Sequence, residues 1–140
     1  MSIARLLTAL SMTISASLTF AAPAAPLALD HSSSTLIDKP TAMTLWKGAL
    51  SSAKLVKLYP VGKWGFVSEV EGGFDDAKVC IVTARAMMLP RTGKTLVFQP
   101  AKTATAFGMQ AGASQEQCRE LAKARLGEAI SALRSALIDH

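Results

Sequence analysis

The first 24 residues decide which part of this chain can fold. Residues 1–5 carry one positive charge and no acid, residues 6–20 carry no charge, and small residues follow at 21–25. This order is typical of a secretory signal peptide. The uncharged stretch is too short and too rich in Ser and Thr for a stable membrane span. The sequence therefore predicts a signal peptide at 1–24, cleavage between Ala21 and Ala25, and a periplasmic or secreted protein without a transmembrane anchor.

The remaining residues have the composition of one small globular domain. The whole chain has 140 residues, of which 50% are hydrophobic and 18% charged, and this excludes a disordered protein. Loss of Arg5 with the signal peptide lowers the formal charge from +5 to +4. Residues 25–39 are mostly polar, so we expect a flexible N-terminal arm there. Residues 40–140 are expected to form a single α+β domain.

The first regular element is a helix that begins near Pro40, after Asp38 as a start signal. Leu55–Tyr59 could instead already be a strand, and the pattern leaves these two interpretations open. Gly48 would weaken the helix by about 1 kcal/mol relative to Ala. The apolar positions follow one helical stripe: Ala42, Leu45, Trp46, Ala49, Leu50, Ala53 and Val56.

The middle of the chain predicts an antiparallel meander of three or four strands. Residues 64–71 alternate along the chain, residues 77–88 are rich in β-branched residues, and turns are expected at 72–76 and 90–93. Residues 95–99 and 103–109 are shorter strand candidates. Ser114 and Gln117 then form a capping-box pattern. An amphipathic helix follows, and its mixed off-face charges favour packing on the sheet over binding to a membrane surface.

Exactly two cysteines in an exported chain predict one disulfide bond. Cys80 lies in the strongest strand and Cys118 lies on the apolar face of the C-terminal helix, so a bond would join helix to sheet. Cys80 must then face the helix, together with Val82, Ala84 and Ala86. The opposite strand face, from Val79 to Met87, is too apolar to be bare. We expect the first helix to cover it; the alternative is contact with another protein.

Residues with catalytic chemistry are few and poorly placed in this sequence. His31 lies in the arm and His140 at the last position, which suits neither a catalytic base nor a metal site. Glu69 and Glu71 share one strand face, where a solvated pair is more common than acid–base chemistry. No cofactor, catalytic residue or metal ligand is predicted.

The positive charge is concentrated between residues 39 and 102, which hold ten Lys or Arg and four acids. Ordinary solubilising charge explains much of this excess. Because export argues against nucleic acid, we expect a protein or an anionic envelope polymer as partner. The residues expected to contact it are Trp64, Arg85, Arg91 and Lys94.

These observations favour an exported, non-enzymatic binding module for a protein or envelope partner. Two alternatives stay open: an exported hydrolase with a dispersed site, and a structural or stress-related envelope protein. A binding module should expose an apolar or aromatic patch rimmed by Arg85, Arg91 or Lys94. The sequence indicates no oligomeric state.

Overall fold

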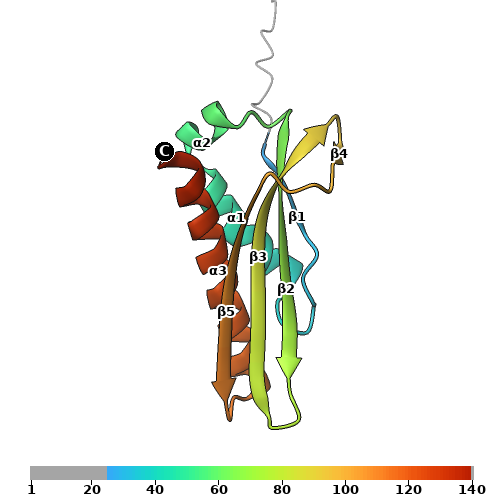
Figure 1. Cartoon of the computed structure of the whole chain (residues 1–140), viewed down its shortest axis with the longest axis vertical. Coiled ribbons are helices and arrows are strands. Elements are labelled where there is room, and N and C mark those ends of the chain that lie inside the picture. The colour runs from blue at the N-terminus through green and yellow to red at the C-terminus, as the bar shows by residue number, and fades with distance from the viewer. Residues whose placement is uncertain (1–24, 140) are drawn as a thin grey trace, which may run out of the picture.

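A computed structural model describes residues 25–139, and the predicted signal peptide lies outside the described residues. The domain is an elongated α+β structure in which a twisted sheet packs against helices, as the sequence predicts (Figure 1). Its elements, in chain order, are β1 (Leu27–Asp30), α1 (Lys39–Leu50), α2 (Ala53–Leu58), β2 (Trp64–Phe74), β3 (Val79–Thr92), β4 (Thr95–Leu96), β5 (Lys102–Ala111) and α3 (Gln115–Ile138).

Three long antiparallel strands form the middle of the sheet. β3 lies between β2 and β5, with Val70 and Ala106 both opposite Ala84. The short β4 pairs with the end of β3 and folds back as a hairpin. This part of the sheet confirms the predicted meander.

The sheet is mixed, however, and not purely antiparallel. β1 pairs in parallel with β2, with Leu27 opposite Gly65 and Asp30 opposite Ser68. These four residues belong to the segment that we expected to be an arm. The turn after β1 also buries Leu36 and Ile37 against the inner core. The pattern missed β1 because four residues are too short to show a period and the partner strand lies far along the chain.

The helices begin at side-chain caps. Asp38 Oδ1 accepts a hydrogen bond from the Thr41 amide at 2.8 Å at the start of α1, and Ser52 caps α2. Residues 53–58 are helical, which resolves the alternative that the sequence left open. At α3 both hydrogen bonds of the capping box between Ser114 and Gln117 are present, as predicted.

One face of the sheet, called here the inner face, carries the main core. α3 lies across β3 and β5, and α1 packs beside α3 on this same side (Figure 1). Trp46 of α1 reaches Phe66 of β2 at a ring-centroid distance of 5.5 Å. The predicted inner residues Cys80, Val82, Ala84 and Ala86 are all fully buried there.

The first helix therefore does not cover the other face of the sheet, and that expectation was wrong. Since α1 and α3 share the inner side, they leave the outer face uncovered. Among residues 25–139, Leu96 of the β4 hairpin packs on the upper half of the outer face, and β1, which lies in the sheet beside β2, contributes Leu29 to the small second core that forms there. This core consists of Leu29, Val67, Met87, Leu89 and Leu96.

Candidate interaction surface

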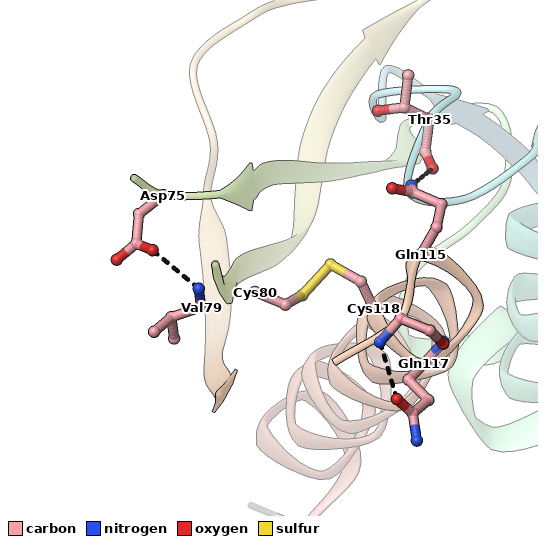
Figure 2. The surroundings of a disulfide bond; sticks show 8 residues. Thr35, Asp75, Val79, Cys80, Gln115, Gln117 and Cys118 are labelled. Atoms are coloured by element: carbon pink, nitrogen blue, oxygen red, sulfur yellow. Dashed lines mark hydrogen bonds between the residues drawn. A yellow bond between two sulfur atoms is a disulfide. The ribbon is translucent and has the colours of Figure 1, made fainter. Parts of the chain in front are cut away.

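A disulfide bond fixes the start of α3 to the start of β3. Cys80 and Cys118 are joined with a Cα–Cα distance of 5.7 Å, and neither is exposed, which confirms the predicted pair. Figure 2 shows the bond beside the Asp75 turn, where the Asp75 carboxylate accepts a hydrogen bond from the Val79 amide at 2.8 Å. In the same region, Gln115 donates to the Thr35 carbonyl at 3.3 Å. Helix, sheet and the segment after β1 are thus held together at this end.

The lower half of the outer face, toward the β2–β3 turn, exposes apolar side chains of β3 and β5 beside Glu71 of β2. Phe107 and Met109 of β5 are 57% and 62% exposed. The register places Phe107 beside Thr83 and Met109 beside Ile81, so these side chains lie on one face. Val79 is half-buried on the same face. We call Val79, Ile81, Phe107 and Met109 the apolar strip.

Arg85 borders the apolar strip on the side toward the β4 hairpin. Its guanidinium forms an ion pair with Glu69 at 3.0 Å across β2 and β3. Both side chains remain accessible, so the pair contributes little to folding stability. Glu69 and Glu71 share this face, as predicted, but Glu69 has a cationic partner and does not form a carboxylate pair with Glu71.

A second exposed apolar site lies on the connection between β4 and β5. Val97 is 43% and Phe98 66% exposed. The Phe98 ring stacks on His31 with 6.1 Å between ring centroids. This stack holds His31 on the surface against an apolar partner, and no carboxylate in residues 25–139 forms an ion pair with its ring.

Basic residues gather at one end of the sheet and acidic residues at the other. Lys63, Arg91, Lys94 and Lys102 lie at the end near the β4 hairpin, because β2 and β5 begin where β3 ends. The Arg91 guanidinium donates to the carbonyl groups of Gly93 and Val61, and these neutral acceptors do not neutralise its charge. The opposite end carries Glu71, Asp75 and Asp76 with one Lys78. We call Lys63, Arg91, Lys94 and Lys102 the basic end, and we call Glu71, Asp75 and Asp76 the acidic end.

The four residues predicted to contact a partner do not form one surface. Arg91 and Lys94 lie together at the β3–β4 hairpin, and Arg85 lies further along the outer face. Trp64 is on the inner side, half-buried, edge-on to Tyr59 at 6.1 Å and packed against the main core.

Phe107 and Met109 were missed because their exposure depends on where the helices pack. Residues 103–109 were predicted as a strand, but alternation alone cannot tell which set of side chains faces α3. Gly108 is the sequence signal that indicates which side of this strand faces α3. Its missing side chain leaves room for Leu121 and Arg125, whose atoms would lie 3.0–3.1 Å from a Cβ at this position. A glycine on the helix side leaves Phe107 and Met109 on the outer side.

A polar cleft of about 210 Å³ lies between the start of α1 and α3. The hydrogen bonds from Thr41 lower the pKa of Asp38 below its usual value of 3.8, with smaller contributions from Arg119 and Lys123. Three acidic and two basic side chains line the cleft. No group of three or more His, Cys, Asp or Glu side chains in residues 25–139 is arranged to hold a metal ion. None of the helices in this range has the length and hydropathy of a membrane span.

Comparison with known proteins gives only distant structural similarity. No protein-family model and no curated protein matches the sequence. The structure resembles PelC from Paraburkholderia phytofirmans, described as a dodecamer, with 11% identity and a TM-score of 0.43 over 83% of this chain and 94% of that chain. A single-substitution variant of the same PelC dodecamer gives 10% identity and a TM-score of 0.41, covering 81% and 95%. Similarity at this level does not indicate a shared function.

Proposed function

We propose that this protein is an exported, non-enzymatic binding module that contacts a protein through the outer face of its sheet. Export is supported by the order of charged, apolar and small residues in 1–25. The buried Cys80–Cys118 bond is also typical of an oxidising compartment such as the periplasm or the exterior.

The observation that carries the proposal is the exposed apolar strip. Phe107 and Met109 are both more than half exposed on a sheet face whose other half packs against Leu96 of β4. A contiguous apolar surface beside polar residues is typical of a protein contact site, because water contact with it is unfavourable. Arg85 lies at its border, as expected for the rim of such a site.

An anionic envelope polymer fits this face less well than a protein does. Arg85, the cation that borders the strip, is already paired with Glu69. Polymer binding would need free cations, and these lie at the basic end instead. A polymer is therefore expected to contact Arg91 and Lys94 and to leave the apolar strip exposed.

Site-specific cross-linking in the producing cells tests this proposal. A photoreactive amino acid replaces Phe107 in one variant and Leu58 of α2 in the control, because Leu58 is 51% exposed but lies away from the outer face. We expect cross-linked protein from position 107 and none from position 58. Equal yields at both positions, or none at 107, would contradict the proposal.

Export has a test of its own. N-terminal sequencing of the protein purified from the producing cells shows whether the chain is cleaved between Ala21 and Ala25, as we predict.

A further inference from the structure

We infer that the groove between β1 and α1 binds a free fatty acid, with the hydrocarbon chain against its apolar walls and the carboxylate near Lys47. This groove is separate from the apolar strip, so the inference goes beyond the proposed function. The volume of the groove is about 350 Å³, which is at the small end of ligand-binding pockets. It therefore suits one hydrocarbon chain better than a lipid with two chains.

The walls of the groove come from one face of α1 and from the start of the described chain. The α1 residues are three or four positions apart, so they lie on the same side of the helix. On β1, Ala28 lies opposite Phe66, which is part of the main core, so Ala28 faces the inner side where α1 packs. Its small side chain leaves space beside the helix. The lining residues are Ala25, Pro26, Ala28, Met43, Trp46, Lys47, Leu50 and Ser51.

The charge at the groove favours an anionic ligand. Lys47 is the one charged side chain among the described residues that line it. It is exposed, and no carboxylate in residues 25–139 forms an ion pair with it. Residues 39–68 contain five Lys and no Asp or Glu, so the surrounding sequence adds positive charge and no acid. A cationic ligand would be repelled here.

The walls explain the rest of the ligand's chemistry. Met43 and Leu50 offer apolar contact, and Trp46 also brings an indole N–H that is buried without a hydrogen-bond acceptor in residues 25–139. Apolar walls with a few polar groups are typical of a small-molecule site. A fatty acid matches both parts, because its chain is shielded from water while its carboxylate accepts a charge-assisted hydrogen bond from Lys47.

Isothermal titration calorimetry of the exported protein, with its disulfide intact, tests the inference. The probe is decanoate below the concentration at which it forms micelles, and we expect saturable binding of one molecule per chain. Decyltrimethylammonium has the same hydrocarbon chain and the opposite charge, so it should bind about tenfold more weakly or worse. Octanoate lacks two methylene groups and should bind about fivefold more weakly.

Substitutions locate the binding site. Lys47→Glu should raise the dissociation constant for decanoate about tenfold, because it replaces the attractive charge by a repulsive one. Lys57→Glu makes the same change at an exposed lysine of α2 that does not line the groove, and the constant should stay within about twofold. Ala28→Phe should abolish binding by filling the groove. Circular dichroism checks that each variant is folded, and the exposed position of Lys47 keeps the test valid if Ala28→Phe does not fold.

The inference is overturned if decanoate shows no saturable binding, if the cationic probe binds equally well, or if the two lysine variants lose affinity equally. Binding to phosphatidylglycerol vesicles without binding of decanoate would also overturn it, since a membrane surface would then be the occupant. None of these results depends on Phe107, so the proposed function stands or fails separately through its cross-linking test.

Discussion

Gly72 and Gly48 place opposite demands on the backbone. Gly72 is in β2 with φ +132°, and a Cβ there would overlap the carbonyl oxygen of Ile81 in β3. Gly48 lies in α1, where a Cβ would meet no atom within 4 Å. A methyl group at the first position therefore disrupts the sheet, whereas at the second it only improves helix propensity.

Gly72→Ala should lower the free energy of unfolding by about 3 kcal/mol or more, from strained backbone and the clash with β3. Gly48→Ala should raise it by about 1 kcal/mol. Chemical denaturation of the two variants and the parent chain measures both changes. A stable Gly72→Ala variant would show that β2 and β3 do not approach as described.

The Asp38 cap makes the start of α1 sensitive to pH. Because the hydrogen bonds from Thr41 lower the pKa of this carboxyl below 3.8 in the folded state, they stabilise the fold above the unfolded-state pKa. That stabilisation is lost as the pH falls through the folded-state pKa. Asp38→Asn retains a capping oxygen but does not titrate, so part of the stability loss between about pH 5 and pH 2 should disappear. Identical acid-unfolding curves for the two proteins would contradict this.

Interactions between residues that are close in the sequence could be predicted from the sequence. Ser114 and Gln117 were predicted as a cap because both bonds are local. The Cys80–Cys118 pair was predicted because only one pairing exists. The exposure of Trp64 could not be predicted, since it depends on Tyr59 and on the core that the helices complete.

At the scale of elements, a buried polar contact adds to the backbone pairing of β1 with β2. Asp30 accepts hydrogen bonds from Ser68 at 2.7 Å and from Ser32 at 2.6 Å, and Ser68 is fully buried. The contact joins the edge strand β1 to β2. A strand of four residues has few other bonds, so the position of β1 could not be predicted from its pattern.

Asp30→Ala should cost about 1–3 kcal/mol, because the buried Ser68 hydroxyl loses its acceptor. Adding Ser68→Ala removes the unpaired group and should recover part of that loss. Denaturation of the two single variants and the double variant gives the coupling energy. Strictly additive effects would mean that the Asp30–Ser68 bond does not hold β1 in place.

The disulfide connects two elements that are 38 residues apart in the sequence. Loop-closure entropy predicts that Cys80→Ala/Cys118→Ala is less stable by about 4 kcal/mol. Denaturation of the oxidised parent and the double variant measures this difference. A loss below about 1 kcal/mol would show that the unfolded chain is little constrained by the bond.

At the scale of the whole molecule, the side of the sheet that α1 covers determines the surface. The sequence shows that both helices and the strand face from Val79 to Met87 are apolar, but not which of them meet. α1 packs beside α3 because Trp46 completes the inner core with Phe66. The predicted alternative, contact of the uncovered face with another protein, is therefore the one that the proposed function adopts.

Met109 gives the most direct test, because an exposed methionine oxidises readily and a covered one does not. Mild peroxide treatment of intact producing cells, followed by mass spectrometry, can be compared with the same treatment of the dilute purified protein. We predict that Met109, which is 62% exposed in a single copy, is protected several-fold in cells. The buried Met87 and Met88 should react slowly in both samples. Equal, rapid oxidation of Met109 in both would contradict the claim that the outer face is a contact surface.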